Sequence, residues 1–386
     1  MSYSSTRGAS NLTTAEGQGT VRVAIVGTGF GQKVHIPGFK DHPRTEVVAV
    51  YHRDIDKAEA IAKTNDIPFA VNTIEDIAKM ENLEAVSIST PPFLHYEMAK
   101  PILAAGKHLL LEKPTTLSAS EAKELYQIAT DKNVVTAMDF EFRFVPAWQR
   151  LKELLEQGYC GTLRLIKVDW LVASRADANR AWNWYAQKDK GGGALGAIGS
   201  HSFDYIPWLF GPVGRLCGHL STAVAQRPDP AAGGQLKPVD ADDTGMLMLQ
   251  LRDGTPVQIT LSSATYGGRG HWVEVYGDRG TLILGSDNLK DYVHGFKLWG
   301  APAGEELTEL EIPSRLAFEK TYPDGRIAPF IRTIDNWVRG IDAAKASAPS
   351  LLDGVYSQLL MDSTHESHAT GRFVEIPTIE AFMAGG

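Results

Sequence analysis

The sequence predicts an α/β protein with two domains, in which a doubly wound parallel sheet is followed by a second α/β unit built on antiparallel hairpins. Three observations predict this arrangement. Strand-like runs alternate with helix-like segments from residue 21 to about residue 140, the pattern of a parallel sheet with crossover helices. From residue 213 onward the chain is mainly strand-like, with tight turns between paired runs. The length of 386 residues exceeds the roughly 250 to 300 at which a single core stops growing.

The composition is that of an ordinary water-soluble protein and disfavours some classes of binding partner. A net charge of −8, spread along the chain, argues against binding to nucleic acid or to an anionic membrane surface. No run reaches the ~18 to 20 apolar residues of a membrane-spanning helix. Cys160 and Cys217 form no CxxC pair, so we expect a reducing, cytoplasmic setting. Residues 1–20 are polar, lack a secretory signal and are expected to form a disordered tail.

The first domain is expected to span residues 21–143. Apolar and β-branched runs predict buried strands at 21–27, 46–52, 84–90, 107–113 and 133–138. Helical spacing predicts connecting helices at 55–65, 73–80, 93–106 and 118–133. Gly106 is a helix stop signal, and Ser118 with Glu121 makes a capping box.

The first strand runs directly into GTGFGQ, residues 27–32, which matches part of the dinucleotide-binding fingerprint of a Rossmann fold. Gly27 and Gly29 occupy the first two glycine positions, where a tight turn and close approach of the backbone to a pyrophosphate are needed. The third position falls on Gln32, and Gly31 stands one residue early. We expect a dinucleotide cofactor to lie against the loop residues Gly27, Thr28, Gly29, Phe30, Gly31 and Gln32.

The end of the second strand, YHRD at residues 51–54, distinguishes the two nicotinamide cofactors. An NAD enzyme usually ends this strand with a carboxylate that accepts from the ribose 2′-hydroxyl. Here the end carries His52 and Arg53, and an arginine is suited to a 2′-phosphate. NADP is therefore favoured. NAD is possible if Arg53 is solvated and Asp54, a plausible helix N-cap, turns back to the ribose.

The 84–90 strand ends at the same crevice, where doubly wound folds bind ligands. Ser89, Thr90 and Pro92 are expected to hold the ribose and the pyrophosphate of the cofactor. His95, a little further along, is either a structural residue or a cofactor contact.

Lys113 lies at the end of the fifth strand, in the stretch LLLEKP. Pro114 removes a backbone donor and restricts the conformation of the lysine, so that its side chain is aimed into the crevice. There it is placed to exchange protons with a substrate oxygen. The alternative is a solvated charge at the end of a strand.

Residues 144–386 are expected to form a second, substrate-binding domain. The predicted helices are 146–158, 326–344 and 353–370, and the predicted strands are 162–172 and the hairpins within 245–264 and 271–284. A Pro/Gly-rich stretch at 226–242 is expected to be a loop.

The polar and aromatic segment 174–190 is expected to lie over the mouth of the crevice. Trp182 and Trp184 are candidate pocket walls, with core packing as the alternative. The three glycines at 191–193 would give hinges or a close approach to the substrate.

The motifs TPP…H, EKP, GGGAL…H..D and VEVYGDRGTL follow one another along the chain. With this order and spacing, the sequence from Val21 to the C-terminal end closely resembles the Gfo/Idh/MocA oxidoreductase family. The resemblance implies an N-terminal Rossmann domain and a C-terminal α/β domain whose open, largely antiparallel sheet forms one wall of the substrate pocket and often a subunit interface. It also implies a sugar-, cyclitol- or polyol-like substrate and a homo-oligomer, either a dimer or a tetramer.

The resemblance further implies roles for particular residues. The lysine of the EKP motif, here Lys113 after Glu112, interacts with the substrate and the cofactor. After the triple glycine the family has an aspartate and, four residues later, a histidine on the same helix face. These positions are Ala197 and His201 here. His201 is expected to be the general acid or base, whereas Ala197 cannot bind a substrate hydroxyl, which leaves substrate choice and activity open.

Arg143 and Trp182 are also expected to contact the substrate, and Asp204 is expected to orient the structure. No metal site is predicted. Neither His201 with Asp204 nor the pair His365 and His368 has further ligands at a suitable spacing.

The leading hypothesis is an NADP(H)-dependent oxidoreductase. It would move a hydride between nicotinamide and a hydroxyl-bearing or carbonyl carbon, while Lys113 and His201 handle the proton of the substrate oxygen. Two alternatives stay open. Some relatives cleave glycosides through transient oxidation by a tightly held NAD. Others are cofactor-binding sensors or repressors without turnover, an alternative that Ala197 keeps open.

Overall fold

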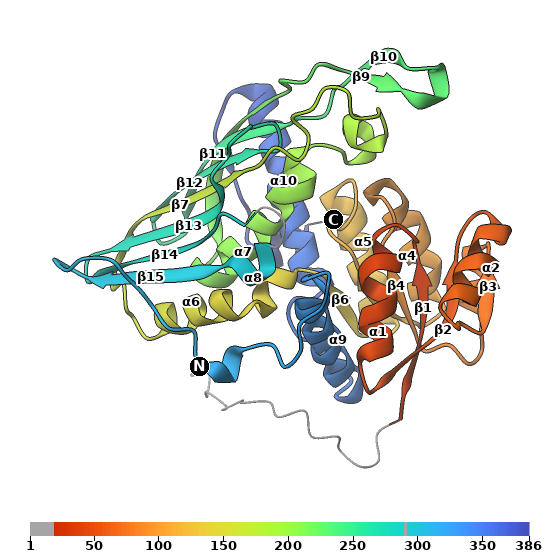
Figure 1. Ribbon diagram of the computed structural model, residues 1–386. Helices are drawn as coiled ribbons and strands as arrows, with labels where there is room; N and C mark the ends of the chain where they lie inside the picture. Colours follow the sequence, from red (N-terminus) through yellow and green to blue (C-terminus); the bar gives the residue numbers. More distant parts are fainter. Residues whose placement is uncertain (1–18, 289–291, 386) are drawn as a thin grey trace.

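The structure is a computed structural model that describes residues 19–288 and 292–385. Two sheets, each with its own helices, lie side by side (Figure 1). The tail expected at residues 1–20 lies, up to residue 18, outside the described residues. No helix of the described ranges is long and apolar enough to cross a membrane.

Six parallel strands form the first sheet in the order β3-β2-β1-β4-β5-β6, which is the strand order of a Rossmann fold and confirms the predicted fold class. The strands are β1 (Val21–Val26), β2 (Thr45–Tyr51), β3 (Phe69–Val71), β4 (Ala85–Ile88), β5 (His108–Leu111) and β6 (Thr136–Met138). The sequence does not predict β3. This edge strand has only three residues and leaves Phe69 51% exposed, so it lacks the buried apolar run by which a strand is recognised.

Helices connect these strands: α1 (Ile36–Asp41), α2 (Ile55–Thr64), α3 (Ile74–Lys79), α4 (His95–Ala104) and α5 (Ala119–Asp131). The side chains of Asp54, Thr73 and Ser118 each accept a hydrogen bond from a backbone N–H of the helix that follows. These caps satisfy backbone donors that have no partner inside the helix, and they fix where α2, α3 and α5 begin.

One helix from the end of the chain packs against the first sheet. α9 (Ile327–Asp342) buries Phe330, Ile334 and Trp337 in the core that β1 and α1 also form. Figure 1 shows α9 next to α1 and β6. The chain therefore returns to the first sheet near its end, in a segment that the sequence assigns to the second domain.

Nine strands form the second sheet in the order β16-β15-β14-β13-β7-β12-β11-β8-β17. Every neighbouring pair is antiparallel except β12 with β7, which confirms the largely antiparallel sheet. The strands are β7 (Leu163–Leu171), β8 (Val213–Ser221), β11 (Thr244–Leu251), β12 (Pro256–Ser262), β13 (Gly270–Gly277), β14 (Gly280–Ser286), β15 (Lys297–Pro302), β16 (Thr308–Glu309) and β17 (Val374–Glu375).

Helices cover one face of the second sheet (Figure 1). They are α6 (Pro146–Glu156), α7 (Ser200–Phe210) and α10 (Leu351–Thr370), which bury Trp148, Phe203 and Leu360 against the strands. Two shorter helices are α8 (Tyr292–Gly295) and α11 (Ile379–Ala384). On the opposite face, Met246 and Met248 of β11 are 55% and 56% exposed, so this side of the sheet keeps apolar surface in contact with water.

The segment 226–242 differs from the prediction of a loop. Within it β9 (Gln226–Asp229) and β10 (Gln235–Pro238) form a two-stranded hairpin that extends away from the second sheet (Figure 1). Proline cannot donate to a strand ladder, but in a ribbon of two strands each strand is an edge strand, where proline is tolerated. The prolines that suggest a loop are therefore compatible with a hairpin.

Candidate active site

A cavity of about 700 Å³, here called the first cavity, opens at the carboxyl end of the first sheet and is lined by residues from both domains. Doubly wound folds bind ligands at this edge, and the volume is typical of a small-molecule site. The lining includes the predicted site residues Gly27, Thr28, Gly29, Phe30, His52, Arg53, Ser89, Thr90, Pro92, Glu112, Lys113, Ala197 and His201.

The glycine loop has the geometry of a pyrophosphate-binding turn. Gly27 has φ +104°, and a Cβ on it would lie 2.7 Å from the carbonyl carbon of Ser89. Gly29 has no neighbour within 4 Å of such a Cβ, so its backbone faces open space at the cavity. The turn therefore needs glycine at position 27, and the open space at Gly29 leaves room for a ligand to approach the backbone.

Gly31 stands one residue before the third glycine position of the fingerprint, but it serves the purpose of that glycine, which is close packing of the helix on the strand. A Cβ on it would lie 2.5 Å from Ser89 Oγ and 3.3 Å from Ile25, so it allows the helix to pack closely on β1. The helix begins here with a π-helical turn, η1 (Gly31–His35), which shifts its register from that of an ordinary α-helix. Gln32 is exposed and does not line the first cavity.

The end of β2 presents Arg53 to the cavity and directs Asp54 elsewhere. Asp54 Oδ1 accepts a hydrogen bond from the backbone N–H of Lys57 at 3.4 Å, and its Oδ2 pairs with Lys57 Nζ at 3.6 Å. Asp54 is therefore the N-cap of α2. His52 and Arg53 line the first cavity.

The end of β4 carries a buried hydroxyl that is suited to a ligand. Thr90 Oγ1 is buried and has no hydrogen-bond partner among the described residues, although Thr90 lines the first cavity. A ribose or phosphate oxygen of a dinucleotide would satisfy it, and together with the glycine loop it fits such a cofactor. His95 lies outside the lining. Its ring nitrogens bond to the carbonyl groups of Thr90, Pro114 and Thr115, so it joins two loops as a structural residue.

Lys113 extends into the first cavity from the end of β5. Its Nζ donates to the backbone carbonyl of Ala197 at 3.4 Å, and its backbone N–H donates to Glu112 Oε2 at 3.2 Å. The lysine therefore contacts the turn that precedes α7 in the second domain. An aspartate would be expected at position 197, and here the backbone oxygen of Ala197 provides an acceptor in its place.

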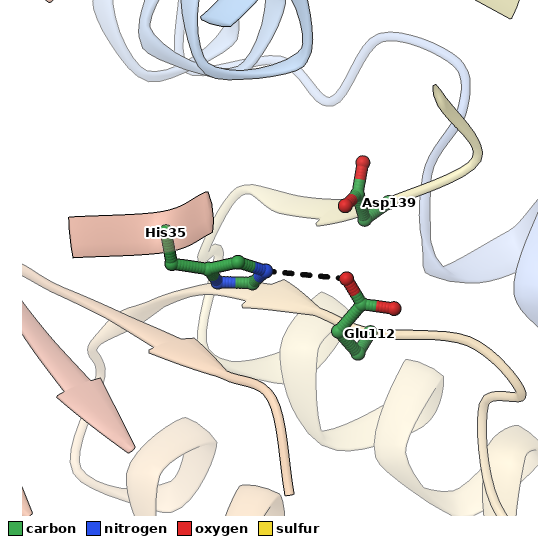
Figure 2. A group of neighbouring side chains, drawn as sticks. All are labelled: His35, Glu112 and Asp139. Atoms are coloured by element: carbon green, nitrogen blue, oxygen red, sulfur yellow. Dashed lines mark hydrogen bonds and ion pairs between the residues drawn. The ribbon is translucent and has the colours of Figure 1, made fainter. Parts of the chain in front are cut away.

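The buried side chains of His35, Glu112 and Asp139 form a cluster (Figure 2), and Glu112 directly precedes Lys113 in the chain. His35 Nε2 lies 3.2 Å from Glu112 Oε1, and His35 Nδ1 lies 2.8 Å from Ser87 Oγ. Asp139, at the end of β6, hydrogen-bonds with Glu112. Their ligand atoms lie within 4.8 Å of one another, as in clusters that hold a metal ion. We interpret the group as a hydrogen-bonded network, because both ring nitrogens of His35 already have protein partners.

The two carboxyl groups of this network are in different states. Burial alone would raise the pKa of Glu112, but the hydrogen bond with His35 and the charge of Lys113 lower it to about 2. Burial and the adjacent charge of Glu112 raise the pKa of Asp139 well above its ordinary value. Glu112 is therefore the carboxyl group of the cluster that favours the charged form, and Asp139 is the one that favours the protonated form.

These states predict opposite outcomes for two matched amide variants. Asp139→Asn replaces an acid that favours its neutral form by a neutral amide, and we expect turnover close to that of the unmodified protein. Glu112→Gln removes the carboxylate that holds the backbone of Lys113, and we expect a loss of turnover of roughly 10- to 100-fold from mispositioning. Initial rates at pH 7 and melting temperatures measure both effects. Equal losses in the two variants would contradict the assigned protonation states.

The triple glycine brings the start of α7 against a buried carboxylate. Gly193 has φ +102°, and a Cβ on it would lie 2.5 Å from Asp242 Oδ1. Asp242 Oδ2 accepts from the backbone N–H of Leu195 at 2.8 Å and so caps the following turn. That turn, η6 (Leu195–Gly199), is π-helical, a feature frequent at functional sites. The glycines thus serve a fixed, close-packed helix start.

His201 follows one turn later and is 4% exposed at the first cavity. The ring of Phe142 meets it edge-on, with 4.8 Å between centroids. Burial, followed by the charges of Lys113 and His271, holds the pKa of His201 well below its ordinary value. The imidazole is therefore neutral at physiological pH and able to accept a proton. Its Nδ1 has no hydrogen-bond partner in the part of the chain that the structure describes.

Two predicted substrate contacts lie away from the first cavity. Arg143 Nη2 bonds to Asp204 and to Asp353, the latter at 2.9 Å, and Arg143 lines a separate cavity. Trp182 Nε1 donates to the carbonyl of Pro238 at 3.0 Å, and Lys237 lies over its ring, so Trp182 packs on the β9–β10 hairpin. The sequence singles out both residues but does not reveal the direction in which their side chains point.

Trp184 and Tyr185 line the first cavity, as does Ala197. The guanidinium of Arg175 lies 3.7 Å from the ring centroid of Tyr185 and supports it from behind. Arg326, just before α9, also lines the cavity, and its guanidinium lies 4.8 Å from the ring of Phe30. The aromatic run indicated Trp184. Arg326 follows no motif and is brought to the glycine loop only by the return of the chain to the first sheet.

Comparison with known proteins agrees with this geometry. The family model for the NAD-binding Rossmann fold of the oxidoreductase family matches residues 21–140, and the model for its C-terminal alpha/beta domain matches residues 152–376. The chain belongs to the Gfo/Idh/MocA oxidoreductase family. The resemblance inferred from the sequence motifs is thereby confirmed, and so is the class of enzyme, an oxidoreductase that uses a nicotinamide cofactor.

Members of this family that resemble the chain include an uncharacterized oxidoreductase of Synechocystis sp., 54% identical over 362 residues, which are 94% of this chain and 98% of the relative. Levoglucosan dehydrogenase of Pseudarthrobacter phenanthrenivorans is 26% identical over 390 residues, 94% of this chain and 99% of the relative. A solved structure of levoglucosan dehydrogenase with NADH and L-sorbose superimposes with a TM-score of 0.83 at 24% identity, covering 94% of this chain and 100% of that one. The structural likeness supports the two-domain fold.

Proposed function

We propose that the protein is an NADP(H)-preferring dehydrogenase or reductase that acts on a CH–OH or carbonyl carbon of a sugar-, cyclitol- or polyol-like substrate. The observation that carries the proposal is that Lys113 and His201, from different domains, line the same cavity as the dinucleotide loop. The name of the levoglucosan dehydrogenase relative supports a sugar-like substrate. Trp184 and Tyr185 offer aromatic faces for the C–H face of a sugar ring.

The two polar side chains divide the proton chemistry. The nicotinamide, when bound, supplies the hydride acceptor or donor. In the oxidation direction, neutral His201 accepts the proton of the substrate hydroxyl, and Lys113 donates a hydrogen bond to the same oxygen and stabilises its developing charge. In reduction the proton moves back to the oxygen. The buried position of His201 keeps bulk water from competing for this proton.

Turnover of the protein with a panel of aldoses, polyols and 1,6-anhydro sugars tests this function. We expect a change in nicotinamide absorbance with at least one compound. Consumption of a glycoside without net change in absorbance would favour the glycoside-cleaving alternative. Cofactor binding without turnover across the panel would favour a sensor, for which the absence of a carboxylate at Ala197 is the supporting feature.

Arg53 is proposed to select NADP(H) through the 2′-phosphate. The support is that Asp54 is engaged as the N-cap of α2, while Arg53 lines the first cavity. We expect Arg53→Gln to weaken NADP(H) binding by roughly 10- to 100-fold, the value of a charged hydrogen bond, and to leave NAD(H) binding almost unchanged. Fluorescence titration of both cofactors measures this, with Arg22→Gln as a control on the same sheet. A parallel loss for both cofactors would overturn the assignment.

We also propose a homo-oligomer, a dimer or tetramer, that forms through the exposed face of the second sheet. The support is the exposure of Met246 and Met248 on β11 and the stacked rings of Trp272 and Trp299, 5.6 Å apart, on the same sheet. Light scattering at micromolar concentration measures the state, and a monomer would contradict the proposal. A reducing, cytoplasmic setting is supported by Cys160 and Cys217, which are both free thiols.

A further inference from the structure

A second cavity, of about 440 Å³, shares two elements with the first. In η3 (Glu141–Phe144), Glu141 lines the first cavity, Phe142 contacts His201, and Arg143 lines the second cavity. In α7, His201 lines the first cavity and Asp204, three residues later, lines the second. The two cavities are therefore lined in part by neighbouring residues of the same two segments.

A buried arginine with an unused hydrogen-bonding edge lies at this second cavity. Arg143 is 8% exposed, and its Nε and Nη2 bond to Asp204 and Asp353. Among the described residues, none is an acceptor for its Nη1. Nη1 is also not fully buried, so it belongs to the small exposed part of the side chain. A guanidinium held this rigidly presents a donor to a ligand at little entropic cost.

The rest of the lining indicates the chemistry of the ligand. Trp208 presents an aromatic ring, and Tyr356 adds a second apolar surface. Arg252 and Glu380 add a cation and a carboxylate, neither of which has a salt-bridge partner among the described residues. Two arginines and three carboxylates leave the cavity close to neutral, so it has no excess positive charge for a phosphate. Donors, acceptors and an aromatic face together fit an uncharged ring that carries hydroxyl groups.

We propose that the second cavity is a binding site for an unphosphorylated cyclic polyol, distinct from the substrate site. The ring lies on Trp208, a hydroxyl accepts from Arg143 Nη1, and another hydroxyl donates to Glu380. Because η3 and α7 also carry Phe142 and His201, a ligand there touches the segments that position the general base. The inference goes beyond the proposed function, since it concerns binding and holds whether or not the first cavity turns over a sugar.

Fluorine NMR of the full chain labelled with 5-fluorotryptophan tests the site. Trp184 reports on the first cavity and Trp208 on the second, and Trp184→Phe and Trp208→Phe assign their signals. The probes are myo-inositol, D-glucose and levoglucosan, added to the NADP-loaded protein. We expect at least one probe to shift the Trp208 signal in a saturable way. Glu380→Gln should weaken that response about 10-fold, the value of one charged hydrogen bond, whereas Glu366→Gln, at an exposed position of α10, should not.

Each outcome separates this proposal from the proposed function. A Trp208 shift that weakens in Glu380→Gln supports the second site, even if Trp184 is silent and no probe is turned over. A Trp184 shift with an unmoved Trp208 overturns it and leaves the proposed function intact. A Trp208 shift with the same midpoint as Trp184, unaffected by Glu380→Gln, also overturns it, because the response would then be transmitted from the first cavity.

Discussion

Lys113→Met is expected to abolish turnover while leaving NADP(H) affinity nearly intact. Lys113 lines the first cavity at the end of β5. Its side chain reaches the turn before α7, where Nζ lies 3.4 Å from the carbonyl oxygen of Ala197. Methionine fills similar space but cannot donate a hydrogen bond to a substrate oxygen. Loss of one donor to a developing oxyanion typically costs about 10²- to 10³-fold, so we expect a fall of up to about 10³-fold in kcat.

Two measurements are needed for this variant. Nicotinamide absorbance gives kcat, and fluorescence titration gives the affinity for NADP(H). Lys100→Met is the matched control, since Lys100 lies on the outer side of α4 and pairs with Glu124 there. The control should behave as the unmodified protein. Turnover at the normal rate in Lys113→Met would refute the role of this lysine, and loss of cofactor binding would show that it acts mainly on the cofactor.

Much of the first domain follows from local sequence rules. Buried parallel strands are recognised by continuous apolar runs, and their ends supply Gly27, Thr90 and Lys113 to one crevice because parallel strands all end at the same edge. Position after a strand therefore predicts a place in the site. The same rule assigns no role to Arg326, which reaches the glycine loop through the packing of α9 on the first sheet.

The remaining differences arise where side-chain direction depends on helix register. A π-helical turn closes its hydrogen bonds over one residue more than an α-helical turn does. In this register Gly31, rather than residue 32, allows the close packing of helix and strand. In η3, successive side chains point to different cavities, so the EFRF stretch could not indicate that Arg143 would point away from the substrate. Spacing along a chain predicts which element a residue belongs to, whereas its direction depends on the packing of that element.

Arg143→Met is expected to have the largest effect on stability. Arg143 bonds to Asp204, which is 2% exposed, and to Asp353 at 2.9 Å. Removing the arginine leaves a buried carboxylate without a counterion, which typically costs about 3 to 5 kcal/mol of unfolding free energy. Arg339→Met is the control, because Arg339 is 55% exposed and pairs with Asp335 near the surface, where such pairs contribute about 0.5 kcal/mol. Urea unfolding measures both variants.

The pH dependence of the loss identifies its cause. Burial raises the pKa of Asp204 to about 6 even with Arg143 present, and without the arginine it rises further. A carboxyl group whose pKa is raised by folding stabilises the folded state at pH values below its unfolded-state pKa, near 3.8. This stabilisation is lost as the pH rises through the folded-state pKa. The loss of unfolding free energy in Arg143→Met should therefore be larger at pH 8 than at pH 5.

The double variant Arg143→Met with Asp204→Leu should recover most of the lost unfolding free energy, because an apolar pair leaves no buried charge. A deficit that is independent of pH and persists in the double variant would mean that Arg143 stabilises the fold by packing on Trp208, 5.7 Å away, rather than by neutralising Asp204.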